Sequence, residues 1–268
     1  MPALKIYFFI LAGLAIPVFA QAPSGQSGQL PSQAKPVEGI LVPVPKEIFH
    51  SLDKFRGANW RAVQRPEVVG WKAHGDQAQI ALLLGVVVAE GFIAMEAEDS
   101  TEVKKVGNTV LTLARALGVE EHALRRSRSI MEYADKNEWA AARKEWDNVL
   151  SDLENGMIEL KSESLSQLVS LAGWLRGTEA LCALVLENYS PESAGLIRQP
   201  ALLDYLEKQL LGMNSEIQTR PVVAKMLEGI RRIRLLIPNE KEAVTEKTVR
   251  EIGGICKELV GLASERPA

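Results

Sequence analysis

Histidine and cysteine are scarce in this chain, which has three histidines and two cysteines among its 268 residues. The histidines, His50, His74 and His122, lie far apart, and neither an HExxH nor a CxxC pattern occurs. Zinc sites and covalently attached haem are usually recognised by such closely spaced ligands. The sequence also contains no GxSxG and no glycine-rich phosphate loop. We therefore expect neither a metal nor another cofactor.

An excess of basic charge is also missing. The formal net charge is −3 at pH 7, and aromatic residues make up 6% of the chain. Proteins that bind nucleic acid usually carry a basic surface, often with aromatic side chains on which bases stack. The composition therefore argues against nucleic acid as a partner. Two arginine clusters fall within helical patterns and are expected on solvent-exposed helix faces: Arg125, Arg126 and Arg128, and Arg231, Arg232 and Arg234.

The apolar run at the N-terminus is short. Residues 1–20, MPALKIYFFILAGLAIPVFA, have one basic residue, Lys5, then an apolar stretch, and Val18 and Ala20 at positions −3 and −1 of a cleavage site. This pattern is typical of a secretory signal peptide, whereas a membrane-spanning helix needs about 20 apolar residues. We predict cleavage after Ala20 and export to the periplasm or the medium. No transmembrane anchor is expected after cleavage.

Residues 21–45 are rich in proline, glycine, serine and glutamine and show no hydrophobic periodicity. Each proline removes a backbone donor and restricts the residue before it. The composition predicts a disordered tether. Residues 46–268 then form a single helical domain.

Helical periodicity dominates the chain after the tether. The clearest stripe recurs at spacings of three and four: Trp139, Ala142, Trp146, Val149, Leu153, Met157 and Leu160. No stretch shows strand-like alternation between turn residues, and the connections between helical segments are short. The fold class is predicted to be all-α, an antiparallel helical bundle of about eight or nine helices. Residues 58–74 interrupt the pattern, and Trp60 and Trp71 within them are expected to pack onto the core.

A glutamate lies inside the most apolar part of this domain, LLLGVVVAEGFIAMEAED, residues 82–99. Apolar residues cover most directions around a helix over residues 76–98, which indicates either a membrane span or a central core helix. The uninterrupted apolar run, residues 80–89, is half as long as a bilayer requires. We therefore predict a core helix that contains Glu90. An isolated buried carboxylate is strongly disfavoured, so Glu90 needs a partner or a proton.

The other nearly all-apolar helix, LAGWLRGTEALCALV over residues 171–185, supplies a candidate partner in Arg176 and a second acid in Glu179. Small residues four apart lie on one face of each helix, Gly173 and Gly177 on this one, Gly85 and Ala89 on the first. Such spacing permits close approach of two helix backbones. We expect the two helices to pack together and to bring Arg176 to Glu90.

Three interpretations of these charges remain open. In the first, Glu90 and Arg176 form a structural ion pair that selects the helix register. In the second, Glu90, Arg176 and Glu179 line a cavity, where the arginine binds a small anionic ligand such as a carboxylate or phosphate. In the third, an enzyme uses Glu90 and Glu179 as general acid and base.

The first interpretation leads to the expected function, an exported non-enzymatic binding or scaffolding protein of the cell envelope with an unidentified protein partner. The second makes the protein a binder of a small anion near Arg176. Cys182 and Cys256 both lie on apolar helix faces. There they fit free core thiols and a disulfide equally well, because the sequence does not show the geometry that a disulfide requires.

Overall fold

The structure is a computed structural model. It describes residues 35–37, 40–42, 52–55, 57–70, 72–73, 75–240 and 242–265. The chain divides into two units, Met1–Leu30 and Pro31–Ala268, and all described residues belong to the second. The predicted signal peptide, residues 1–20, lies outside the described residues, as do most of the predicted tether and Trp71.

The prediction of an all-α domain is confirmed. The long helices are α3 (Gln77–Glu96), α4 (Ser100–Ala116), α5 (Glu120–Asp135), α6 (Trp139–Glu159), α7 (Glu163–Glu187), α9 (Pro200–Gly212), α11 (Pro221–Leu236) and α12 (Glu246–Ser264). The short ones are α2 (Trp60–Val63), α8 (Pro191–Gly195) and α10 (Ser215–Gln218), with the 3-10 turns η1 (Asp53–Phe55) and η2 (Pro66–Val68).

Two short strands occupy part of the segment predicted to be a disordered tether. Strand β1 (Lys35–Val37) pairs antiparallel with β2 (Ile40–Val42), with Lys35 opposite Val42 and Val37 opposite Ile40. Strand β2 contacts α9. Over these residues the prediction of disorder is wrong, because the low apolar content of the whole segment hides one locally apolar run, Ile40-Leu41-Val42, which favours a strand.

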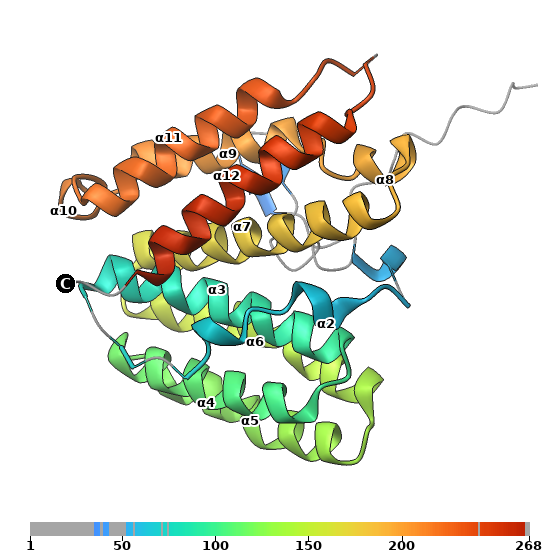
Figure 1. The fold of residues 1–268 in the computed structure, drawn as a ribbon. Helices are drawn as coiled ribbons and strands as arrows, with labels where there is room; N and C mark the ends of the chain where they lie inside the picture. The colour runs from blue at the N-terminus through green and yellow to red at the C-terminus, as the bar shows by residue number, and fades with distance from the viewer. Residues whose placement is uncertain are drawn as a thin grey trace, which may run out of the picture. The chain divides into compact units, whose positions relative to one another are not determined.

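The helices form two groups on either side of α3 and α7, which lie side by side at the centre of the described bundle (Figure 1). Helices α4, α5 and α6 cover one side, and α9, α11 and α12 cover the other. Helices α3 and α7 are each long and apolar enough to cross a membrane, yet most of each is buried by its neighbours. This burial agrees with the prediction of core helices.

Helix direction follows from which residues meet. Gly85 of α3 lies against Gly173 of α7, and Glu90 further along α3 bonds Arg176 further along α7, so these two helices run parallel. Helix α12 runs the opposite way, since Gln79 at the start of α3 donates hydrogen bonds to carbonyl oxygens near the end of α12. Ion pairs make α4 antiparallel to α5 and α5 antiparallel to α6, as the short connections predict. The central pair is parallel because three helices separate its members in the sequence.

Local signals place the helix boundaries. Asp99 caps α4 by accepting the Glu102 N–H at 3.0 Å, and Gly118, with φ of 77°, follows the last turn of that helix in the left-handed conformation that glycine tolerates best. The predicted stripe on α6 faces the core except at one end. Leu160 is 52% exposed, because α6 ends at Glu159 and the chain turns away before Leu160 reaches the core.

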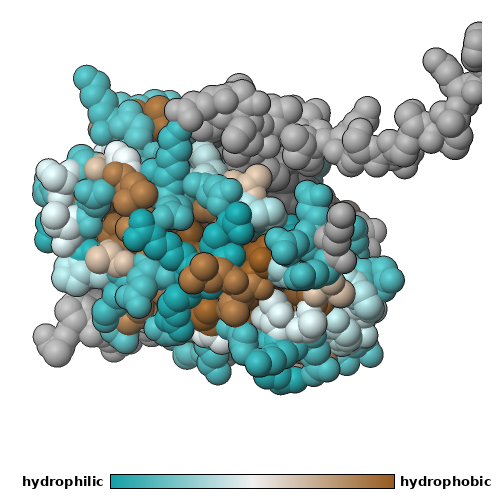
Figure 2. Space-filling model, turned by 90° about the horizontal axis from the view of Figure 1, so that it is seen from above, coloured by the Kyte–Doolittle hydropathy of each residue, from teal (hydrophilic) through white to brown (hydrophobic). Residues whose placement is uncertain are grey.

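The surface of α11 joins its neighbours through ion pairs. Arg231 and Arg234 bond Glu207 and Asp204 of α9 at 2.6 and 2.8 Å, and Arg232 bonds Glu258 of α12 at 3.0 Å. Figure 2, which views the molecule from above, shows small hydrophobic groups separated by hydrophilic side chains. The three arginines are therefore neutralised locally and do not form an unpaired basic patch.

Candidate functional site

The close approach of α3 and α7 creates the site. A Cβ atom at Gly85 would overlap the backbone carbonyl oxygen of Val169, and the nitrogen of Gly173 lies 3.0 Å from that position. The predicted contact between the small residues of the two helices is therefore present. About one turn further along, this interface holds Glu90 and Arg176, whose side chains bond each other across it.

Glu90 and Arg176 form a buried ion pair. Nε of Arg176 donates to Oε1 of Glu90, and their side chains are only 1% (Arg176) and 2% (Glu90) exposed. Helical periodicity had predicted this partnership, since each group needed a partner in a core that offers few charges. The pair uses one oxygen of the glutamate and one nitrogen of the arginine.

The remaining bonds go to a segment that crosses α3 and α7, residues 57–70, which we call the strap. Nη2 of Arg176 donates to the carbonyl oxygen of Val63, and the backbone N–H of Arg65 donates to Oε2 of Glu90 at 3.2 Å. Both strap groups belong to the backbone. No sequence motif marks them, so sequence reasoning had predicted only an irregular segment at this point.

Glu179 completes the network. Its Oε1 accepts from Nη2 of Arg65, and its Oε2 lies 3.5 Å from Nη1 of Arg176. Burial raises the pKa of Glu179 above its ordinary value, and the nearby Glu90 adds to this, whereas Arg176 and Arg65 oppose it. Two carboxylates and two guanidinium groups thus meet in one buried cluster with no net charge when all are ionised.

Further contacts hold the strap along its length. The ring of Trp60 meets that of Phe92 edge to face, with centroids 6.2 Å apart, and Trp60 is buried as predicted. The N–H of Gly70 donates to Oγ1 of Thr109 on α4 at 2.8 Å. Exposed Arg61 bonds Asp99 at 3.0 Å. The strap is therefore attached to α3, α4 and α7.

The structure brings together all three predicted site residues, Glu90, Arg176 and Glu179, and adds Arg65, which the sequence reasoning missed. Nε and Nη2 of Arg176 donate hydrogen bonds within this cluster, and Nη1 lies 3.5 Å from Oε2 of Glu179. An external anion would have to replace Val63 or a glutamate to bind Arg176. The arrangement as it stands joins three segments of the chain.

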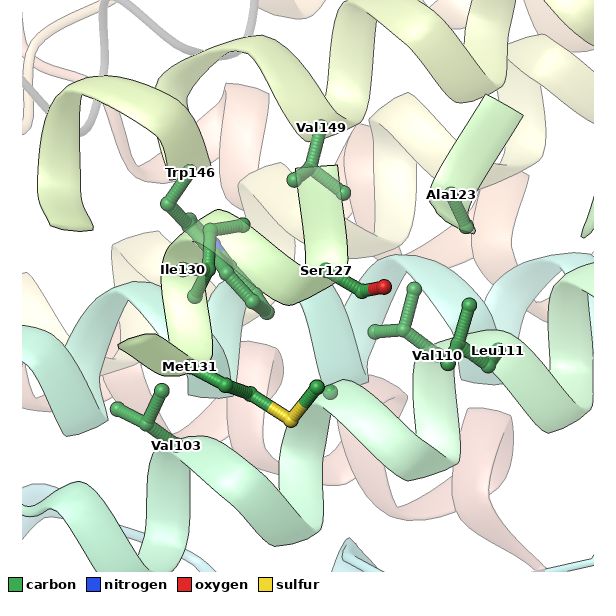
Figure 3. A pocket seen from close by; sticks show the side chains of 10 residues that line it. Val103, Val110, Leu111, Ala123, Ser127, Ile130, Met131, Trp146 and Val149 are labelled. Atoms are coloured by element: carbon green, nitrogen blue, oxygen red, sulfur yellow. The ribbon is translucent and has the colours of Figure 1, made fainter. Parts of the chain in front are cut away.

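A small hollow lies elsewhere, between α4, α5 and α6, where Val110, Met131 and Trp146 are among the lining side chains (Figure 3). Its volume is about 10 Å³, which is close to the minimum that holds one water molecule. Ser127 is its only side chain with a hydroxyl group. The hollow is too small for the ligand sizes that pockets usually take.

Nucleophilic and metal-binding groups are placed unfavourably for chemistry. Cys182 and Cys256 are buried free thiols, and burial raises the pKa of Cys182 to about 12 and that of Cys256 well above its usual range. His122 packs against Gly156, and its Nε2 lies 3.5 Å from Glu159. Within the described residues, no group of three or more His, Cys, Asp or Glu side chains could hold a metal ion.

Comparison of the chain with protein families, with curated proteins and with solved structures finds no match. Function therefore has to be argued from the geometry of this chain.

Proposed function

We propose that this protein is an exported, non-enzymatic binding or scaffolding protein of the cell envelope, built on a helical bundle. The proposal rests mainly on the hydrogen bonds that the buried charged side chains make. Glu90, Arg176, Glu179 and Arg65 bond one another and the strap backbone. Such a cluster supports a role in which the buried charges hold one defined arrangement of helices and strap.

Two further features support a role in binding over a role in catalysis. Each candidate acid–base glutamate has an arginine at hydrogen-bond distance, whereas a general acid or base must reach a proton of the substrate. The thiols are buried with raised pKa values, so little reactive thiolate forms near neutral pH. Export is supported by the signal-peptide pattern of residues 1–20.

Cross-linking of the full chain in its native cells, followed by mass spectrometry, tests the proposal. We expect reproducible cross-links from surface lysines of the bundle to one envelope protein. In parallel, the purified protein is heated with a panel of carboxylates and phosphates, and we expect no shift of the melting temperature. N-terminal sequencing of the exported chain should begin at Gln21.

The alternative, a small anion bound at Arg176, gives the opposite pattern. One compound of the panel would raise the melting temperature, and Arg176→Lys, which keeps the charge but loses the planar fork, would abolish that shift. The control Arg232→Lys changes an exposed arginine of α11 and should leave the shift intact. Such a result, or an unprocessed Met1 end retained in the membrane, would overturn the proposed function.

A further inference from the structure

The strap contacts the bundle in the way that a bound peptide contacts its receptor. Arg176 and Glu90 bond a carbonyl and an N–H of the strap that lie two residues apart, at Val63 and Arg65. These backbone contacts do not depend on the strap sequence. The side chains of Trp60 and Arg65 reach Phe92 and Glu179 respectively. In peptide recognition, backbone contacts usually provide affinity and side-chain contacts provide specificity.

The strap is only partly buried. Of the strap residues whose side chains the structure describes, Trp60 alone is fully buried, and the others are half-buried or exposed. Ala58, Val63 and Val69 are half-buried against the core, so the strap buries less apolar surface than a core helix does and opens at a lower free energy. Detachment of the strap would therefore not require the helices to separate.

Glycines bound the strap at both ends. Gly57 and Gly70 have φ angles of 87° and 86°, and a Cβ atom at either would meet nothing within 4 Å. Glycine changes its backbone angles with little steric resistance, so both ends can act as hinges. The segment between them can move as one piece.

We infer that the face of α3, α4 and α7 beneath the strap is a peptide-binding surface, and that the strap is its internal ligand. The partner is a short linear segment of another protein, with an aromatic side chain where the strap has Trp60 and an arginine five residues later, where the strap has Arg65. Phe92 selects the aromatic side chain and Glu179 selects the arginine. Glu90 and Arg176 bind a backbone N–H and a backbone carbonyl of the peptide. This inference rests on the proposed binding function and names the partner's chemistry.

Binding in trans tests the inference directly. A fluorescent peptide with the sequence of residues 57–70, GANWRAVQRPEVVG, is titrated with the full chain and followed by anisotropy. In the double variant Trp60→Ala/Arg65→Ala the internal ligand is weakened and every residue of the face is kept. We expect this variant to bind the peptide at least about tenfold more tightly than the wild-type chain, where the strap competes.

Matched controls separate specific from general effects. Glu67→Ala changes an exposed strap side chain outside the cluster, so this variant should bind the peptide as weakly as wild type. A peptide carrying alanine at both the tryptophan and the second arginine should not saturate. In the double variant, adding Thr109→Val removes the acceptor for Gly70 N–H and should lower affinity several-fold.

Hydrogen exchange of the wild-type chain keeps the test valid if the double variant fails to fold. The amide of Arg65 is protected by a side chain, Glu90, and we expect it to exchange faster than the amides in the middle of α3. Exchange as slow as that of α3, or equal peptide binding by wild type and a folded double variant, overturns the inference. Dimers of the wild-type chain joined by exchanged straps would also overturn it, by making a second copy the partner. Cross-links to an envelope protein that lie elsewhere on the bundle would overturn this inference but not the proposed function.

Discussion

Glu90 and Arg176 show how a charge is kept inside a core of aliphatic side chains. Each is nearly completely buried, and each bonds both the other residue and the strap backbone. A buried ion pair need not add net stability, but removal of one member leaves the other charge without compensation. We therefore expect the pair to favour one packing of α3, α7 and the strap more than it adds to stability.

The double-mutant cycle of Glu90→Gln and Arg176→Met measures this coupling. Each single change should lower the free energy of unfolding by about 3–5 kcal/mol, because it leaves a buried charge unpaired. The double variant should lose less than the sum, by about 0.5–3 kcal/mol, as expected for residues in contact. Complete recovery is not expected, since Val63 also loses its donor. Strictly additive losses in urea titrations would contradict a direct pair.

Glu179 predicts a pH dependence of stability. Its pKa is raised above the ordinary value of 4.5, so the native state holds a proton that the unfolded chain has already released. The free energy of unfolding therefore falls as the pH rises from 4.5 through the raised pKa of Glu179, because the native state binds more protons than the unfolded state does. The Glu179→Gln variant does not ionise and lacks this loss.

Urea titrations over a series of pH values compare Glu179→Gln with wild type. The difference in unfolding free energy, variant minus wild type, should increase across this window and become constant above it. Glu187→Gln changes an exposed glutamate at the end of the same helix and serves as the control for loss of one surface carboxylate. A difference that stays flat for Glu179→Gln would show that Arg65 and Arg176 cancel the effect of burial on the pKa of Glu179.

At the scale of elements, small residues decide how closely the helices approach. The α3–α7 contact at Gly85 has no room for a side chain, and a Cβ atom at Gly91 would overlap the ring of Trp146 on α6. Nε1 of Trp146 donates to the carbonyl oxygen of Val88 at 3.1 Å, which orients that ring. Two glycines of α3 thus set its distance to α7 and to α6.

Gly85→Ala tests the first of these contacts. The added Cβ would overlap the backbone oxygen of Val169, which cannot move without shifting α7, so we expect a loss of about 1–3 kcal/mol or more. The control is Gly254→Ala on an exposed part of α12, where a Cβ meets nothing within 4 Å. Helix propensity predicts a gain there of about 0.5–1 kcal/mol. Thermal or urea unfolding measures both, and an equal gain at Gly85 would contradict the close approach.

At the scale of the described unit, the bundle has a core pair and two covering groups, so segments far apart in sequence depend on one another. Strand β2 lies before the first helix and contacts α9, while the strap joins α3, α4 and α7. Long-range contacts of this kind can make short segments outside the helices contribute to stability.

Two deletions separate the parts of the predicted tether. Removal of residues 21–34 should leave the melting temperature unchanged, since their composition offers little apolar surface to bury. Removal of residues 21–42 also takes away β1 and β2 and should lower it, because β2 contacts α9. Calorimetry of both chains measures the difference. Equal melting temperatures would show that the hairpin does not contribute to stability.

Helical periodicity predicted the long helices of this protein, because a helix is held together by hydrogen bonds within four residues and its buried stripe recurs at regular spacings in the local sequence. The same reasoning paired Glu90 with Arg176, since a buried charge needs a partner and the other apolar helix carried one. Gly85 and Gly173 marked the contact because only small residues permit it.

Tertiary structure alone decided the parallel direction of α3 and α7, the docking of β2 on α9, and the role of the strap. Arg65 resembled any other surface arginine in the sequence, and its N–H and the carbonyl of Val63 exist in nearly every residue. Backbone groups carry no sequence signature. Which backbone groups meet Glu90 and Arg176 depends on the path of the chain through the folded structure. Local sequence does not encode that path.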